Sequence, residues 1–480
     1  MKGHTTYFVL GCLIFLTVCG FNTTASAQTR TLRIVAYNIE ADIGVTNKQP
    51  TFTNIMTSSA EGPPLPGLIA PVTNSSAVQS GGVLEGIGEE IVNGNAQPLD
   101  ILALEETTSN PLTVAPIVSA LNSFYGIAGM YSNSSYQATE EFGDPTVGDG
   151  PNAIVFNTRT VQLLASTPVD PPGGANNLGS TYGEYREVMR YEFTLAGVAP
   201  AATNEFYVYV SHYKSGGTSA DLTERKGEAQ IIRTNEAIDL PATARVLYVG
   251  DYNITSNREA SYQIIVSNSA PNGIQQGAGV DPFYPANNQA INWHSSTTDT
   301  NLLSQESDND EFIQYRDDLE MMTTNVYSGA AGGLKYIPGT YHSFGNNGSI
   351  AYQASVNNVT NTALKNLVTN GLVFISASQL LVDLTGASDH LPVVADYTIP
   401  IPAPVITGVS VAGTNLVLNV ANSITGGVYT VLMSTDISLS LTNWTALAIT
   451  NTATSGSLML TATNAVNLAT PKSFYLLQEK

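Results

Sequence analysis

Short apolar runs alternate with polar stretches through residues 28–402. Runs of about four to eight apolar or β-branched residues predict strands that are buried on one or both faces. The runs are Leu32–Ile39, Ile101–Leu104, Ala153–Asn157, Phe206–Ser211, Val246–Val249 and Pro392–Tyr397. The clearest helical pattern covers residues 222–238, with Asp221 as a candidate cap and Glu224 completing a capping-box spacing. This alternation predicts sheets covered by helices.

Two polar stretches interrupt the pattern, at residues 41–97 and 254–310. Both are rich in residues that favour turns, and loops this long usually serve as lids, decorations or binding segments. We therefore expect two loop insertions in the main domain. The acidic loop 308–311 lies in the second insertion, and its carboxylates are compatible with a structural Ca²⁺ ion.

The C-terminal part of the chain has a different composition. Residues 405–480 carry very few charges, and runs such as Asn415–Val420 and Tyr429–Met433 read as strands between Gly and Asn turn signals. A proline-rich stretch at residues 399–404 precedes them and predicts a stiff linker. We expect a main domain over residues 28–398 and a small all-β sandwich over residues 405–480.

The N-terminal segment, residues 1–27, is typical of a signal peptide. An apolar run, Tyr7–Phe21, follows a short polar start, and Ala25–Ala27 offers the small residues of a cleavage site. We expect a mature chain that begins at Gln28 and is secreted, periplasmic or held at the cell surface. An uncleaved membrane anchor is the alternative. No later run is long and apolar enough to predict a permanent membrane span.

Composition excludes several classes of protein. Lys plus Arg is 18 and Asp plus Glu is 39, which gives a net charge of −21 and argues against a basic nucleic-acid binder. The 43% of hydrophobic residues argues against a disordered chain. Both cysteines, Cys12 and Cys19, lie in the predicted signal peptide, so the mature chain can form no thiolate metal site. If the protein acts on a phosphate ester, a bound cation or a few local basic residues must supply positive charge.

Polar residues follow several of the predicted strands directly. Asn38 follows the first strand, and the second ends in two carboxylates, Glu105 and Glu106. Neighbouring residues of a strand face opposite ways, so one of the two glutamates should point into a site at this edge. Carboxylates at a strand end suit hard cations such as Mg²⁺. A turn at Asn38 and a solvated strand end are the simpler alternatives.

Three further strand-end motifs carry candidate chemistry. His212 lies just beyond a strand, and Gly250-Asp251-Tyr252-Asn253 ends another with a carboxylate and an amide two positions apart. Asp389 and His390 lead into the last strand and can combine a ligand or proton partner with a general base. Each motif alone also fits an ordinary polar turn, but five of them at strand ends in one chain indicate a shared site.

In this order the motifs Tyr-Asn-Ile, Asp-Ile-x-x-Leu-x-Glu, Ser-His-x-Lys-Ser, Gly-Asp-x-Asn and Ser-Asp-His-x-Pro-Val resemble the endonuclease/exonuclease/phosphatase superfamily, the deoxyribonuclease-I-like fold. The resemblance covers about residues 30–400 and is nearest to bacterial extracellular nucleases. It implies a four-layer α/β/β/α sandwich with the site at one end of two packed sheets.

The resemblance also implies roles for individual residues. Asn38 and Glu106 match metal-binding positions, while Glu105 stands where the family often has Gln and leaves open which glutamate faces the metal. His212 matches a histidine that contacts the scissile phosphate. Asp251 and Asn253 match the pair that orients the nucleophilic water and the transition state.

The remaining matches concern the last motif and two looser segments. Asp389 matches a metal ligand or a histidine-orienting Asp, and His390 matches a general base or phosphate-binding histidine. Arg186 is the candidate phosphate-contacting residue. Asp318, with Asp317 as the alternative, matches the Asp that orients the first histidine, His212; a solvated acidic loop is the simpler interpretation of this pair.

Together these expectations describe a secreted, metal-dependent phosphodiesterase that uses Mg²⁺ or Mn²⁺, because the expected ligands are oxygen donors. Nucleic acid is the expected substrate, and no obligate protein partner is evident. A phospholipid phosphodiesterase of the sphingomyelinase type, or a phosphomonoesterase, keeps the same fold with another substrate. A non-catalytic surface-binding protein is the alternative of another class.

Overall fold

The computed structural model describes residues 5–11, 29–40, 82–94, 96–107, 110–136, 150–169, 186–201, 203–267, 277–284, 313–330, 332–367, 377–424, 427–451, 456–467 and 472–479. The chain divides into two compact units. The larger unit comprises residues 31–193 and 202–398, and the smaller one residues 1–30, 194–201 and 399–480. Among the described residues, no helix is long and apolar enough to cross a membrane.

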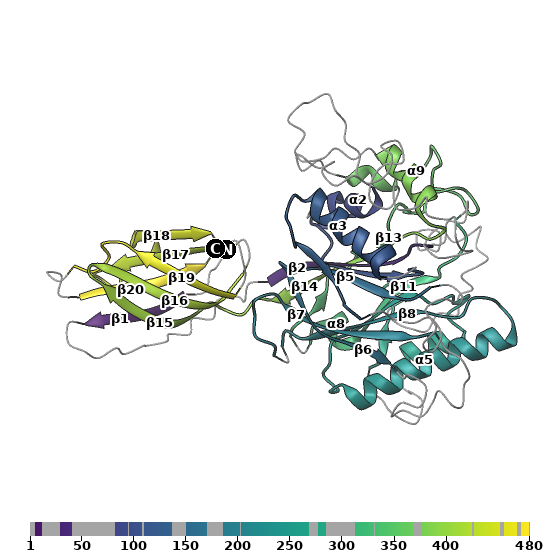
Figure 1. The fold of residues 1–480 in the computed structure, drawn as a ribbon, viewed down its shortest axis with the longest axis horizontal. Helices are drawn as coiled ribbons and strands as arrows, with labels where there is room; N and C mark the ends of the chain where they lie inside the picture. The colour runs from purple at the N-terminus through teal and green to yellow at the C-terminus, as the bar shows by residue number, and fades with distance from the viewer. Residues whose placement is uncertain are drawn as a thin grey trace. The chain divides into compact units, whose positions relative to one another are not determined.

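Two mixed sheets form the core of the larger unit (Figure 1). The first has the order β12-β14-β2-β3-β5-β4, with β13 paired to β14; its strands are β2 (Thr29–Asn38), β3 (Ile101–Glu105), β4 (Tyr131–Asn133), β5 (Ala153–Asn157), β12 (Lys335–Tyr336), β13 (His342–Ser343) and β14 (Val393–Pro400). The second has the order β10-β11-β9-β8-β7-β6; its strands are β6 (Val161–Val169), β7 (Val188–Leu195), β8 (Phe206–His212), β9 (Val246–Asp251), β10 (Gly279–Val280) and β11 (Asp318–Thr323). All six strands predicted from the apolar runs are confirmed.

Helices cover one face of each sheet (Figure 1). The first sheet shares an apolar core with α2 (Val83–Glu89), α3 (Ala115–Phe124) and α9 (Ala377–Ala387), and the second with α5 (Ser219–Asp239) and α6 (Ala260–Val266). Between the sheets, the rings of Phe156 and Phe193 lie 5.7 Å apart, and the Tyr397 hydroxyl donates a hydrogen bond to Glu320. The layers therefore follow the order helix, sheet, sheet, helix. Short helices complete this unit at Asn110–Val114, α8 (Thr324–Ser328) and Ala363–Asn366.

The structure corrects two expectations. The cap of α5 is Thr218, whose side chain accepts a hydrogen bond from the Asp221 amide; Asp221 is the third helical residue and closes the capping box in return. The stretches expected as loop insertions also contain α2 and α6. In both, apolar residues recur at helical spacing, as at Val83, Leu84 and Ile87, and are buried. Residues 41–81 and the loop 308–311 lie outside the described residues.

Two small antiparallel sheets make up the smaller unit. One contains β15 (Val405–Ala412), β16 (Asn415–Ser423) and β19 (Gly456–Ala462), and the other β1 (Thr5–Gly11), β20 (Lys472–Glu479), β17 (Val428–Ser434) and β18 (Thr445–Asn451), with a short 3₁₀ turn at Leu441–Asn443. Side chains of both sheets share one apolar core that includes Leu418, Val431 and Leu460. β1 falls within the predicted signal peptide and pairs with β20; cleavage before Gln28 stays a prediction.

Candidate active site and metal centre

The ends of four strands place the polar residues of the site. β2 and β3 run parallel in one sheet, and β8 and β9 run parallel in the other. Parallel strands bring their carboxyl ends to the same edge, which is why strand-end residues from distant parts of the sequence meet. Asn38 and Glu106 come from the first sheet, and His212 and Asp251 from the second.

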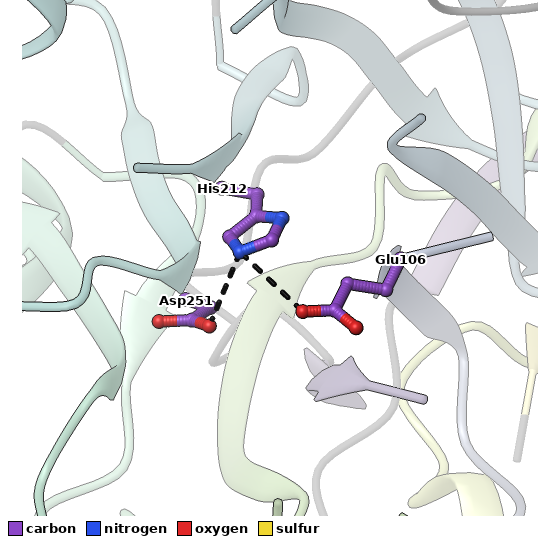
Figure 2. Close-up of side chains that lie close together, drawn as sticks. All are labelled: Glu106, His212 and Asp251. Carbon is purple, nitrogen blue, oxygen red and sulfur yellow. Dashed lines mark ion pairs between the residues drawn. The ribbon is translucent and has the colours of Figure 1, made fainter. Parts of the chain in front are cut away.

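Glu106, His212 and Asp251 form one buried cluster (Figure 2). The Nε2 atom of His212 lies 3.6 Å from Glu106 Oε1 and 3.5 Å from Asp251 Oδ2. None of the three residues is more than 4% exposed, so solvent screens their interactions weakly. Two carboxylates and an imidazole nitrogen within reach of one point can hold a metal ion.

Asn38 links two members of this cluster through hydrogen bonds. Its amide nitrogen donates to Glu106 Oε1 at 2.8 Å and to Asp251 Oδ2 at 3.0 Å, while its amide oxygen accepts from the Glu40 backbone N–H. Its amide hydrogens thus orient two carboxylates of the cluster. The expected part of Asn38 in binding a metal stays a prediction, since its amide oxygen keeps a second lone pair.

The backbone settles which of the two glutamates enters the cluster. Glu105 ends β3 and is fully buried, with Gly250 packed close to its carboxylate. Glu106 follows with a φ of 55°, in the left-handed region that ordinary residues seldom adopt. This turn brings the Glu106 carboxylate to His212 and Asn38. Backbone strain of this kind concentrates at functional sites.

Burial changes the protonation of the cluster. Loss of solvent raises the pKa of Glu106 well above its usual value, even though His390 and the Asn38 hydrogen bond oppose the shift. Burial lowers the pKa of His212, and the positive charges of Arg186, His390 and Lys214 lower it further. His212 is therefore a neutral imidazole, which can offer a nitrogen lone pair.

His390 and Asp318 form a second element of the site. His390 Nδ1 lies 2.8 Å from Asp318 Oδ2, and its Nε2 lies 3.8 Å from Asp251 Oδ2. Burial lowers the pKa of His390, but the charges of Asp318 and Asp251 and the Asp318 hydrogen bond outweigh burial and raise that pKa well above its usual value. His390 is thus an imidazolium beside the neutral His212.

The expected partner of Asp318 is wrong. We expected Asp318 to orient His212, whereas it binds His390. Strand register explains the difference: Asp318 begins β11 directly opposite Asp251 at the end of β9, and His390 reaches this point from the other sheet. Beside it, the Asp317 backbone carbonyl accepts a hydrogen bond from the Tyr252 amide.

Asp389 precedes His390 and lies beside its ring. Its side chain is 34% exposed, and its Oδ1 is 3.8 Å from His390 Nε2. Among the described residues, neither group that could hold a metal includes Asp389; they are Glu106–His212–Asp251 and Asp251–Asp318–His390. The Asp389 Oδ1 atom is itself buried, although the side chain as a whole is partly exposed. Both roles expected for Asp389, metal ligand and histidine-orienting group, stay predictions.

Arg186 and Asn253 meet at one backbone carbonyl. Arg186 Nη1 donates to the Tyr213 carbonyl at 2.9 Å, and Asn253 Nδ2 donates to the same oxygen at 3.0 Å. The Asn253 backbone N–H also donates to Asp251 Oδ1 at 2.9 Å, and the Asn253 backbone lies in the left-handed region. Both expected substrate-contacting residues are therefore anchored next to the cluster, one residue beyond His212.

Sequence reasoning gave no role to Ser388. Its hydroxyl donates to the Asn38 carbonyl at 2.7 Å and accepts from the His390 amide at 3.0 Å. It thereby ties the segment carrying His390 to the end of β2. The signal was present as a serine two positions before His390, a spacing that commonly makes side-chain-to-backbone turns.

The residues of the cluster fit a bound cation. Glu106 Oε2 is buried without a hydrogen-bond partner among the described residues. Buried carboxylates that face each other are unfavourable unless a cation or protons compensate them. A divalent cation at Glu106 and Asp251, with His212 alongside, would supply that charge. Carboxylate oxygens favour hard cations, whereas the imidazole also suits later transition metals.

No sequence profile of a known family and no curated protein matches this chain. Several solved structures do. The human Nocturnin catalytic domain is 13% identical over 77% of this chain and 97% of its own, with a TM-score of 0.40. An endonuclease/exonuclease/phosphatase from Beutenbergia cavernae is 13% identical over 93% and 96%, with a TM-score of 0.35. TDP2 from D. rerio, solved with a single-strand DNA product, is 12% identical over 76% and 98%, with a TM-score of 0.36.

The chain matches solved structures of the endonuclease/exonuclease/phosphatase fold.

Proposed function

We propose that this protein is a metal-dependent phosphodiesterase that hydrolyses nucleic acid. The observation that supports it most is the buried cluster Glu106–His212–Asp251, whose two carboxylates and imidazole face one point, beside the imidazolium of His390. Hydrolysis of a phosphodiester needs neutralisation of the phosphate oxygens, an activated water and stabilisation of the charge that develops at phosphorus. This edge of the two sheets offers residues for each need.

Asp251 is the group best placed to activate water. Burial raises its pKa, and its Oδ1 and Oδ2 atoms are held by Asn253 and Asn38. A general base works best when its pKa is near the operating pH. In the proposed step Asp251 takes a proton from the attacking water. His390 does not act as the base here, because it already carries a proton between two carboxylates.

Cationic and neutral hydrogen-bond donors are proposed to stabilise the charge on the phosphate. His390, held by Asp318, supplies positive charge to the phosphate oxygens. Asn253 and Arg186 are positioned through the Tyr213 carbonyl to contact the phosphate beside it. A Mg²⁺ or Mn²⁺ ion held at Glu106, beside His212, would neutralise the phosphate further and stabilise the leaving oxygen. Preorganised donors of this kind are usually the largest contribution to catalysis.

We further propose that the enzyme acts outside the cytoplasm, following cleavage of the predicted signal peptide. The net charge of −21 would repel a polyanion at long range, so a locally positive site is required for nucleic acid to bind. His390, Arg186 and the bound cation provide that positive charge.

A panel of substrates tests the proposal. Purified mature protein is incubated with a DNA or RNA oligonucleotide, with sphingomyelin and with p-nitrophenyl phosphate, each with Mg²⁺ and with chelator. We expect metal-dependent cleavage of the oligonucleotide. Cleavage of sphingomyelin or of the monoester alone would overturn the nuclease assignment and keep the metal-dependent phosphoesterase. Inactivity on all three by folded, metal-loaded protein would leave a binding function.

A further inference from the structure

A charged and aromatic cluster lies beside the site and has no part in the chemistry described so far. Arg316 forms two hydrogen bonds with the Asp281 carboxylate, at 2.8 and 2.9 Å, and both residues are at most 1% exposed. Arg316 also donates to the Tyr341 hydroxyl at 3.1 Å, and Tyr262 donates to Asp281 at 3.0 Å. A buried bidentate pair with this many partners has one fixed geometry.

This pair fixes two aromatic rings. Asp281 accepts from the Phe283 amide at 3.0 Å through its side chain and from the Tyr284 amide at 3.1 Å through its carbonyl. The Arg316 guanidinium carbon lies 5.8 Å from the centre of the Phe283 ring and 5.7 Å from that of Tyr284. The two rings meet edge to face, 4.7 Å apart at 84°. Cation–π contacts hold both rings in place.

Strand register places this cluster at the rim of the site. Asp318 pairs with Asp251, and the Tyr252 amide donates to the Asp317 carbonyl at 2.9 Å, so contact with the segment after β9 continues one residue beyond β11. Arg316 comes directly before this contact and two residues before Asp318, whose carboxylate binds His390.

Both rings are half-buried, so part of each is open to solvent. A rigid aromatic corner next to a phosphate-handling site suits a planar ring that can stack on it. An acyl chain would need a longer apolar surface. None of the exposed large hydrophobic residues in the described part of the chain lies within residues 277–284 or 313–323.

We propose that Phe283 and Tyr284 form a stacking platform for a nucleobase next to the scissile phosphodiester. This inference rests on the proposed nuclease function and adds to it a specificity-determining surface. Arg316 and Asp281 act as positioning residues, because they hold the rings and do not contact the substrate themselves. Since the rings are held before substrate arrives, little conformational freedom is lost on binding.

The test compares KM and kcat of Phe283→Ala and Tyr284→Ala with wild type on two oligonucleotides. One is a normal strand, and the other carries abasic tetrahydrofuran residues beside the cleaved bond. Stacking on aromatic side chains contributes about 1–3 kcal/mol per base, which converts to a rise in KM of about 5- to 150-fold. We expect this rise on the normal strand with kcat within about twofold, and no change on the abasic strand.

Tyr327→Ala is the matched control. Tyr327 is another half-buried tyrosine, stacked on Tyr336, and it follows β11 at the end away from Asp318. It should change neither constant on either substrate. Phe283→Trp should restore the wild-type KM, because it keeps a stacking ring, whereas Phe283→Leu should not. Both variants keep a large apolar side chain at residue 283, so their comparison separates stacking from folding.

Several results would overturn the platform. If Phe283→Ala is active and its KM is unchanged, there is no platform, but the nuclease function stands. The same conclusion follows if the variant loses equal affinity for the normal and the abasic strand. If wild-type protein cuts neither strand but cleaves sphingomyelin or p-nitrophenyl phosphate, the nuclease function fails, and the platform fails with it.

Discussion

Asp318 begins a strand of one sheet and His390 precedes a strand of the other, yet their side chains meet at 2.8 Å and make His390 a cation at the edge of the site. The contact joins the first residue of β11 to the segment that leads into β14. Its effect is to separate the two histidines of the site by charge: His390 is protonated, and His212, buried beside it, is neutral.

Asp318→Asn should therefore disable the enzyme without removing a metal ligand of the Glu106 cluster. Loss of the carboxylate lowers the pKa of His390, so the imidazolium is lost at a lower pH. We expect kcat to fall by about 10²- to 10⁴-fold, the range for a group that assists proton transfer or charge stabilisation. In a pH–rate profile the decline at high pH should move to lower pH. An unshifted profile would contradict the role given to this pair.

Metal binding should be visible without turnover. Thermal unfolding with rising Mg²⁺ or Mn²⁺ should show stabilisation, about 2.7 kcal/mol at a concentration 100 times the Kd. Glu106→Gln should abolish this response. It should also stabilise the metal-free protein, because it removes a buried carboxylate whose Oε2 atom accepts no hydrogen bond in the described part of the chain.

Glu192→Gln is the control for that variant, since Glu192 is a partly exposed carboxylate on β7. It should leave the metal response unchanged. An equal metal response in wild type and Glu106→Gln would show that the ion binds elsewhere.

Gly250 provides a test of how the site is built. It sits before Asp251 with a φ of 132°, and an added Cβ atom would lie 1.9 Å from the Ser211 carbonyl oxygen. Gly250→Ala should lower the free energy of unfolding by at least about 1–3 kcal/mol from the backbone conformation alone. Gly217→Ala, where a Cβ atom meets nothing within 4 Å, is the comparison in urea unfolding. Equal stability of the two variants would disprove the close packing at this turn.

His342, which lies outside the site, should make the free energy of unfolding depend on pH. Its Nδ1 lies 2.6 Å from the Thr340 carbonyl and its Nε2 2.8 Å from Glu90, so both nitrogens face acceptors. Burial lowers the pKa of His342, but the charge and hydrogen bond of Glu90 outweigh it and raise that pKa above its usual value.

A raised pKa in the folded state stabilises the protein below the unfolded value and ceases to do so as pH rises through the folded value. The wild-type free energy of unfolding should therefore fall over that interval more than that of His342→Gln. Parallel pH dependence in the two proteins would show that His342 is not charged in the fold.

Much of the site was predictable because parallel strands bring their ends together. Asn38, Glu106, His212 and Asp251 each follow an apolar run, and local pattern alone marks them. The contacts between these side chains could not be predicted, because they depend on tertiary geometry. The partner of Asp318 depends on a contact 72 positions away between two sheets. The choice of Glu106 over Glu105 depends on a left-handed residue at the strand end.

The fold was likewise predictable only in part. Apolar runs placed the six central strands, whereas α2 and α6 went unrecognised inside polar stretches because each is only seven residues long. Two turns give too few apolar positions for helical periodicity to stand out. Packing against a sheet, rather than propensity, stabilises such short helices.

The most direct test of the central claim is the rate of oligonucleotide cleavage by wild type, His212→Gln and His342→Gln, each with Mg²⁺ and with chelator. The measurement is made at a pH where all three are folded. The account predicts metal-dependent cleavage by wild type and His342→Gln, and a loss of about 10²-fold or more in His212→Gln. Cleavage that survives in His212→Gln, or that persists in chelator, would contradict it.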